Sequence, residues 1–206
     1  MTHDSSTDRL IGLPAATPAG LEQARAIYEA GFPAAVRAPF SDLLAGHPGE
    51  RTELLLDSDG EVVGLTLVRD LADTSWTFLR YFVVTAERRG SGVGGRLWTA
   101  LCRDLADRGQ ELLLFDVEDP ADPTATTHET VERHRRVTFY RRLGAELVDF
   151  AAYEPPHHGE PGTQALPLRL MAARLDVNGG SSPPRLLPAD AERVVADVLR
   201  HRYGVG

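Results

Sequence analysis

The stretch Glu87–Trp98, ERRGSGVGGRLW, decides the fold of this chain. After Glu87 it has two arginines and then four glycines within the six positions Gly90–Gly95. The β-rich, apolar segment Trp76–Val84 lies just before it. From Gly92 to Arg108, apolar residues recur every four positions, as on one face of a helix. The pattern therefore predicts a central strand, a glycine-rich loop and a helix in direct succession.

A loop of this kind suits a phosphate group for physical reasons. The start of a helix presents unpaired backbone N–H groups and a partial positive charge of about half a unit. Glycines remove the side chains that would keep a diphosphate from these donors. Arg88 or Arg89 can add charge-assisted hydrogen bonds. The alternative is a flexible loop with two solvated arginines, and the loop alone does not decide between them.

The composition is that of one globular domain with additions. The chain has 206 residues, of which 42% are hydrophobic and 25% charged, and its net charge of −8 argues against nucleic-acid binding. No apolar run approaches the roughly 20 residues of a membrane span, and the start MTHDSSTDRL lacks the regions of a signal peptide. The lone Cys102 suits a reducing compartment, so we expect a cytoplasmic protein that does not bind membranes.

Helix and strand signals alternate irregularly along the chain. Thr17-Pro18 begins a helix that Gly31 ends, and a short helix interrupted near Pro39 follows. Asp59-Gly60 joins two strands in a hairpin. After the glycine loop and its helix, the sequence predicts a strand over Leu112–Val117 and a helix over about 130–143. Two strands over 145–153 and 166–175 follow, and a tail helix runs up to Tyr203. This order predicts an α/β (α+β) domain, a mixed sheet with helices on both faces.

We expect three parts along the chain. Residues 1–16 are predicted to be a flexible N-terminal segment, 17–175 the folded domain, and 176–206 a linker and an amphipathic C-terminal helix. The apolar stripe of that helix consists of Ala191, Val194, Val195, Val198 and Leu199. It is predicted to pack on the domain or on a partner subunit, so a homodimer is possible.

One interpretation of the glycine loop is a dinucleotide-binding fingerprint. Gly90, Gly92 and Gly95 satisfy G-x-G-x-x-G, and Asp116 lies about twenty residues further on, at the end of the next strand. However, residues 85–89 separate the strand from the first glycine, and a hairpin precedes the whole unit. Only one more helix follows before the last strands, too few for two mononucleotide-binding halves. We therefore do not favour this interpretation.

The same loop has the form Arg89-x-x-Gly92-x-Gly94, which resembles the pyrophosphate-binding motif of the GNAT acyltransferases (Gcn5-related N-acetyltransferases). Later in the chain, with one strand between, Phe139-Tyr140 and Leu143-Gly144-Ala145 resemble a second stretch of that family. The resemblance covers roughly residues 18–175 and is to the bacterial small-molecule or peptide type.

The resemblance implies the GNAT fold, a mixed and mostly antiparallel central sheet with helices on both faces and here an extra C-terminal helix. A V-shaped splay is implied between the fourth and fifth strands, Trp76–Val84 and Leu112–Val117. It also implies acetyl-CoA as co-substrate, with its pantetheine on the backbone of Val83, Val84 and Thr85. The residues implied to bind its pyrophosphate are Arg88, Arg89, Gly90, Ser91, Gly92, Val93, Gly94 and Gly95, and Tyr140 is implied to lie beside its sulfur.

The activity implied is transfer of an acetyl group to an amine of a small molecule or peptide by direct attack. A backbone N–H near Val84 would polarise the thioester carbonyl. Tyr140 matches the family's general acid, and a phenol suits this role because its ordinary pKa of about 10 keeps it protonated at neutral pH. The alternative is that Tyr140 is a core aromatic on an amphipathic helix.

Three further residues are candidates on the acceptor side. Glu118 directly follows the predicted strand Leu112–Val117. It could hold an ammonium group and accept its proton, or be a solvated loop acid. Arg136, one helical turn before Tyr140, could anchor Glu118 or a substrate carboxylate, or be surface charge. Arg80 lies inside a predicted central strand, where an unpaired charge is costly, so it should reach the cleft or an acid partner.

Other features are departures or exclusions. Many family members carry Asn seven residues before the Tyr, where this chain has Arg133, which puts in doubt how the loop and CoA are held in detail. The seven histidines show no metal-ligand spacing, so no metal is expected, and Cys102 is predicted to be a small buried residue rather than a nucleophile. The alternative functions are O-acyl or longer-acyl transfer, or a non-catalytic CoA-binding sensor or interaction module.

Overall fold

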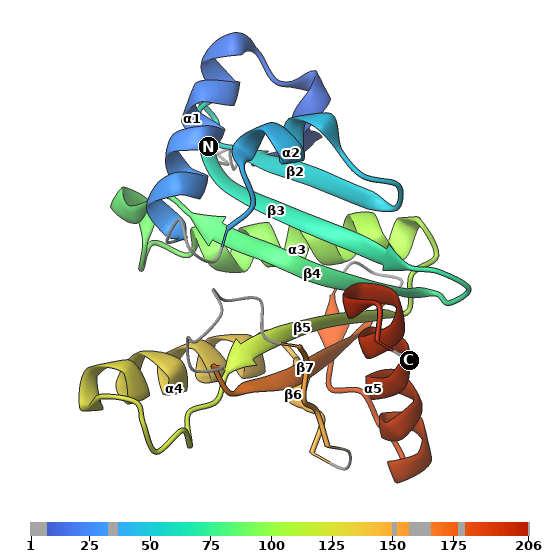
Figure 1. Cartoon of the computed structure of the whole chain (residues 1–206). Coiled ribbons are helices and arrows are strands. Elements are labelled where there is room, and N and C mark those ends of the chain that lie inside the picture. The colour runs from blue at the N-terminus through green and yellow to red at the C-terminus, as the bar shows by residue number, and fades with distance from the viewer. Residues whose placement is uncertain (1–7, 33–36, 150–151, 157–165, 177–179, 206) are drawn as a thin grey trace, which may run out of the picture. The chain divides into compact units, whose positions relative to one another are not determined.

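The strands of the chain pair into one sheet. The computed structural model describes residues 8–32, 37–149, 152–156, 166–176 and 180–205. Within them the strands form an eight-stranded sheet in the order β1-β2-β3-β4-β5-β7-β6, with β8 paired to β7 (Figure 1). Their bounds are β1 Arg9–Gly12, β2 Glu50–Leu56, β3 Val62–Leu71, β4 Trp76–Val84, β5 Leu112–Glu118, β6 Glu146–Leu147, β7 Leu168–Leu175 and β8 Ser181–Ser182.

The helices connect or flank these strands. Their bounds are α1 Pro18–Gly31, α2 Phe40–Ala45, α3 Val93–Asp107, α4 Thr127–Arg142 and α5 Pro188–Tyr203, with short 3₁₀ turns η1 at Leu13–Ala15 and η3 at Ala86–Arg88. None of the helices in the described part of the chain has the length and apolar character needed to cross a membrane.

The sheet is mixed and mostly antiparallel, as predicted. β1 pairs antiparallel with β2, and β7 pairs antiparallel with β5, β6 and β8. β4 and β5 are parallel, and the pairs that join them are Trp76 with Leu112, Thr77 with Leu113 and Phe78 with Leu114. These pairs involve the first residues of each strand.

The chain divides into two units, which are described separately. Unit 1 consists of Met1–Val68 and Arg80–Leu101, and unit 2 of Arg69–Leu79 and Cys102–Gly206. The glycine loop belongs to unit 1. Tyr140, Glu118 and Arg136 belong to unit 2.

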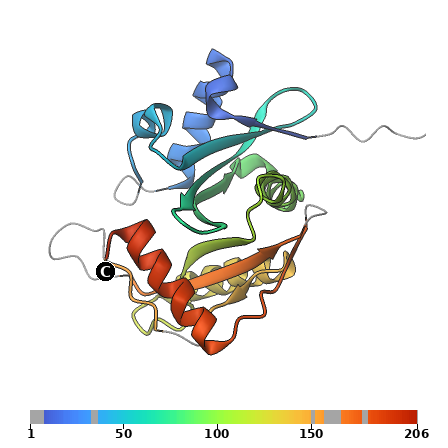
Figure 2. The same ribbon diagram turned by 90° about the vertical axis from the view of Figure 1, so that its right-hand side faces the viewer.

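In unit 1, helices cover both faces of the strands. Thr17 caps α1 by accepting a hydrogen bond from the Gly20 N–H at 3.1 Å, with Pro18 in the first turn, as predicted. The buried face of α1 and α2 packs on one side of β2 through residues such as Leu54 and Leu56, whereas Leu55 packs with α3 on the other side (Figures 1 and 2). The alternation follows from the two-residue period of a strand.

The described part of the N-terminal segment differs from the flexible chain predicted for residues 1–16. Arg9–Gly12 form β1, paired with β2, and η1 follows with Leu13 buried. Leu10 and Ile11 point to opposite faces of the sheet, and each packs against a different core cluster. Two apolar residues in a four-residue strand are too short a pattern to recognise in a sequence.

In unit 2, α4 and α5 cover opposite faces of β5 (Figure 2). Phe115 of β5 contacts Tyr140 of α4, while Leu112 and Leu114 pack with the apolar stripe of α5. The stripe residues buried there are Ala191, Val194, Val195 and Val198. The C-terminal helix thus buries its apolar face on the domain.

The strand predicted over 145–153 is shorter than expected. β6 spans only Glu146–Leu147, although the Val148 N–H still donates to the Leu170 carbonyl at 2.9 Å, and residues 150–151 lie outside the described residues. In the linker, Ser181–Ser182 adds the short strand β8 beside β7.

Candidate active site

The glycine loop of unit 1 ends at an open helix start. After η3 the chain passes through Gly90 and Gly92 with φ angles of 79° and 84°, a left-handed conformation that favours glycine. The first hydrogen bond of the α3 ladder runs from the Arg96 N–H to the Gly92 carbonyl at 3.1 Å. The N–H groups of the three preceding residues, 93–95, therefore come before the ladder and are donors for a ligand.

The space around this backbone fits a diphosphate. A Cβ added at Gly90 or Gly95 would meet no protein atom within 4 Å, so both positions face open space. By contrast, a Cβ at Gly64 would lie 2.9 Å from Leu97 Cδ2, so that glycine serves internal packing. Gly90 and Gly95 are thus not needed to pack the protein, and their bare backbone leaves open space beside the start of α3.

Cationic side chains surround the loop. Arg89 is exposed. Arg88 Nη2 lies 3.4 Å from Asp57 Oδ2 and is also largely exposed. Arg96 pairs with Asp8 and donates to the Ser91 carbonyl at 3.3 Å. Arg96 is a further cation beside the loop that the sequence analysis does not include.

The hydrogen bonds at the end of β4 show which backbone N–H groups point away from β3. The Thr85 N–H donates to the Val63 carbonyl at 3.0 Å, so it is already used within the sheet. Because successive N–H groups of a strand point to opposite edges, the N–H of Val84 points away from β3. Of the three residues expected to pair with pantetheine, Val84 therefore has the best-placed donor, and Thr85 does not offer its N–H.

In unit 2, Tyr140 is buried on the face of α4 that meets the sheet. Its ring centroid lies 4.4 Å from that of Phe115 and 5.1 Å from that of Phe139. Burial raises the pKa of Tyr140 to about 12, and the Arg136 guanidinium partly opposes this shift. The phenol therefore keeps its proton at neutral pH, as a proton donor must.

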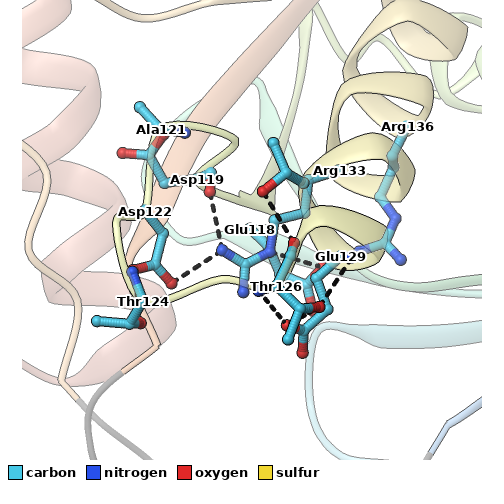
Figure 3. A network of polar contacts seen from close by, with 10 residues as sticks. Glu118, Asp119, Ala121, Asp122, Thr124, Thr126, Glu129, Arg133 and Arg136 are labelled. Carbon is cyan, nitrogen blue, oxygen red and sulfur yellow. Dashed lines mark hydrogen bonds and ion pairs between the residues drawn. The ribbon is translucent and has the colours of Figure 1, made fainter.

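Glu118 is brought together with Arg136, as the sequence allowed (Figure 3). Arg136 Nη1 lies 2.9 Å from Glu118 Oε2, and Arg133 Nε lies 3.8 Å from the same oxygen. The Glu118 side chain is 34% exposed, so its carboxylate reaches solvent, while Arg136 hydrogen-bonds one of its oxygens and Arg133 lies nearby without a hydrogen bond to it. The candidate acid therefore lies partly open to solvent and beside two guanidinium groups.

Arg133 organises the loop between β5 and α4. Its Nη1 donates to Asp122 Oδ2 at 2.9 Å and to the Asp119 carbonyl at 3.0 Å (Figure 3). Asp122 Oδ1 in turn accepts from the N–H and the hydroxyl of Thr124 at 2.9 and 2.7 Å. Thr126 and Glu129 form a capping box at the start of α4. The arginine that replaces the family's Asn is thus a buried structural cation.

This ion pair predicts a pH dependence of stability. The hydrogen bond from Arg133, followed by those from Thr124, lowers the pKa of Asp122 to about 2, below the value of about 3.9 in an unfolded chain. Because the folded pKa is the lower one, Asp122 stabilises the fold above about pH 4 and loses this contribution as the pH falls towards 2. In urea unfolding, Asp122→Asn should therefore lose less stability than wild type over this range.

The control for this prediction is Asp59→Asn, in an exposed turn, which should follow the wild-type pH dependence. If Asp122→Asn instead loses stability as steeply as wild type between pH 4 and pH 2, the Arg133–Asp122 pair is not the source of the effect.

Two other residues singled out from the sequence have structural partners. Arg80 of β4 pairs with Glu50 of β2, both in unit 1, so the acid partner expected for it exists. Cys102 is buried, and desolvation raises the pKa of its thiol to about 12, which does not suit a nucleophile. Among the described residues, no group of three His, Cys, Asp or Glu side chains gathers to hold a metal.

Asp116, the residue of the rejected dinucleotide interpretation, is half-buried and lies between two phenols. The hydroxyl of Tyr153 donates to its Oδ1 and that of Tyr203 to its Oδ2. Desolvation raises the pKa of Asp116, and the two phenol hydrogen bonds oppose the shift. Its carboxylate ties the end of α5 to β5 rather than facing a ribose.

The sheet and the loop define a fold that acetyltransferases share, and comparison with known proteins agrees. The model of the Acetyltransferase (GNAT) family matches residues 21–145, more than half of the chain. The chain therefore belongs to the GNAT acetyltransferase family. No curated protein matches it.

Solved structures support the fold. A GNAT-family protein from Bacteroides thetaiotaomicron is 20% identical with a TM-score of 0.68, covering 96% of this chain and 99% of that one. An aminoglycoside 6'-N-acetyltransferase from Enterococcus faecium is 18% identical with a TM-score of 0.58, covering 87% and 99%. A mutant of a spermidine N-acetyltransferase from Vibrio cholerae is 14% identical with a TM-score of 0.57, covering 82% and 94%.

Proposed function

We propose that this protein transfers an acetyl group from acetyl-CoA to an amine of a small molecule or peptide by direct attack. The observation that carries the proposal is the open start of α3, where residues 93–95 offer N–H groups beside exposed Arg89 and bare Gly90 and Gly95. These groups fit a diphosphate by geometry and charge. Membership of the GNAT family supports the same co-substrate.

Three groups of the chain polarise the thioester carbonyl and transfer the protons. When bound, acetyl-CoA supplies an activated acetyl thioester. The N–H of Val84 donates a hydrogen bond to the oxygen on which negative charge develops. Glu118 accepts a proton from the acceptor's ammonium group, which frees the lone pair that forms the new C–N bond. Tyr140 donates its proton to the sulfur as the C–S bond breaks, and the second proton of the attacking nitrogen passes through solvent to the tyrosinate, which restores the phenol.

The nature of the acceptor follows from charge and from the neighbours. Glu118 offers a partly exposed carboxylate, which attracts a cation. Two of the similar structures are those of an aminoglycoside 6'-N-acetyltransferase and a spermidine N-acetyltransferase. A polyamine-like or aminosugar-like acceptor is therefore the first class to test.

Thermal unfolding with acetyl-CoA tests binding directly. A ligand at one hundred times its dissociation constant stabilises the fold by about 2.7 kcal/mol, which is an easily measured rise in melting temperature. The absence of any rise at millimolar acetyl-CoA would overturn the proposal. Release of free thiol with spermidine, an aminoglycoside and a short peptide then separates an enzyme from a binding protein.

Arg89→Ala should weaken acetyl-CoA binding about tenfold, because a charge-assisted hydrogen bond to a phosphate is worth about 1.5–3 kcal/mol and Arg88 partly compensates. Calorimetric titration measures the effect. Arg103→Ala is the control, since Arg103 is exposed further along α3. Equal affinities of the two variants would remove Arg89 from the binding site.

A further inference from the structure

Arg133 is a buried cation whose orientation is fixed by the β5–α4 loop. Its side chain is only 5% exposed. Two acceptors hold Nη1, Asp122 Oδ2 at 2.9 Å and the Asp119 carbonyl at 3.0 Å. Asp122 is itself held by Thr124, so this end of the guanidinium cannot turn without breaking the loop. The plane of the guanidinium, and hence the direction of its Nε–H, is set by the loop.

The Nε–H of Arg133 is buried and has no hydrogen-bond partner among the described residues. Such a donor is costly to leave unmet. Glu118 Oε2 lies 3.8 Å away, and this oxygen is now hydrogen-bonded by Arg136 at 2.9 Å. A movement of the carboxylate of about 1 Å would close the bond to Nε. Figure 3 shows Glu118 between the two arginines, which reach it from α4.

The two arginines differ in burial and in anchoring. Arg136 is 48% exposed and pairs with Glu118. Arg133 is buried and bound by the loop on its other side. An exposed ion pair is weak and exchangeable, whereas a buried one is fixed in place. The contact with Arg136 can therefore break when a charged substrate arrives, while Arg133 stays where it is.

We propose that Arg133 is a positioning residue for Glu118: the loop fixes its guanidinium so that Nε holds the carboxylate in place while Glu118 receives the proton of the acceptor amine. Arg136 is the exchangeable partner. The inference rests on the proposed function, because it assigns Arg133 a part in the proton transfer made by Glu118.

The experiment separates positioning from folding by removing the ion pair as a unit. Arg133→Met alone would leave Asp122 buried without its cation and can unfold the loop. In Arg133→Met/Asp122→Asn, the Asn amide oxygen can still accept from Thr124, so the loop keeps those bonds. Arg133→Lys keeps the charge, and Arg136→Met removes the exposed partner. Arg135→Met is the control, because Arg135 is 72% exposed and pairs with Glu132.

Steady-state acetylation is measured with the best amine among spermidine, an aminoglycoside and a short peptide, together with the melting temperature and the acetyl-CoA dissociation constant. We expect the double variant to fold and to bind acetyl-CoA as wild type does, with kcat lower by about 10- to 100-fold, as for a misplaced catalytic group. Arg136→Met should lower kcat less, and Arg133→Lys should recover part of the rate.

Wild-type turnover in the double variant would overturn the inference and leave the proposed function intact. So would a larger loss in Arg136→Met than in the double variant, or a loss of acetyl-CoA affinity equal to the loss of kcat. A wild-type protein that neither binds acetyl-CoA nor acetylates any of the three amines overturns both, so the two failures are distinguishable.

Discussion

Tyr140→Phe is expected to lower kcat by about 10²- to 10⁴-fold, the usual contribution of a positioned proton donor. The substitution removes only the hydroxyl, so the ring contacts with Phe115 and Phe139 remain possible. The pKa of about 12 means that the wild-type phenol carries its proton at neutral pH, and Phe has no proton to give. Without it, the sulfur must leave as an unprotonated thiolate.

The measurement is kcat for acetylation and, separately, the acetyl-CoA dissociation constant by calorimetry. The latter should be nearly unchanged, because we propose that the pyrophosphate binds at the glycine loop and not at Tyr140. Thr138→Ala, on the exposed side of α4, is the control and should keep wild-type kcat. If Tyr140→Phe turns over as fast as wild type, the proton comes from another group.

Gly144→Ala is expected to lower the free energy of unfolding by about 2–4 kcal/mol, the sum of left-handed strain and a steric clash. Gly144 has a φ of 89° after the end of α4. An added Cβ would lie 2.3 Å from the Ser181 carbonyl oxygen and 2.7 Å from its carbonyl carbon. These are backbone atoms of β8, which is paired to β7, so they cannot move aside as a side chain would.

Gly109→Ala is the matched control for the clash. Gly109 has a φ of 80°, but a Cβ there would meet no atom within 4 Å. It should therefore show only the conformational cost, about 1 kcal/mol. Urea unfolding of both variants gives the difference. Equal losses would mean that the contact between Gly144 and β8 contributes nothing.

The elements that the sequence predicts well have strong local signals. The Thr17 cap with Pro18 begins α1, the Asp59-Gly60 turn joins β2 to β3, and the glycine loop begins α3. In each case the residues that determine the structure are neighbours in the chain. The same holds for the loop's chemistry, since its glycines and arginines are contiguous.

The elements that the sequence does not predict depend on distant partners. β1 is too short to show a period, and it exists because β2 offers an edge to pair with. β6 is shorter than its apolar stretch suggests: among the described residues, Glu146 and Leu147 pair with β7, and Val148 adds a single N–H bond to Leu170. Pairing energy from another strand decides both cases.

For the candidate site, the sequence by itself predicted the kind of chemistry, namely an open helix start for a diphosphate, a phenol and a carboxylate, and it determined the family. The tertiary structure decided which charged side chains form ion pairs. Arg133 could be read in the sequence only as a departure, and its burial against Asp122 and beside Glu118 follows from how the β5–α4 loop folds back on α4. Local patterns depend on neighbours along the chain, whereas an ion pair between residues 11 positions apart depends on the fold that brings them together.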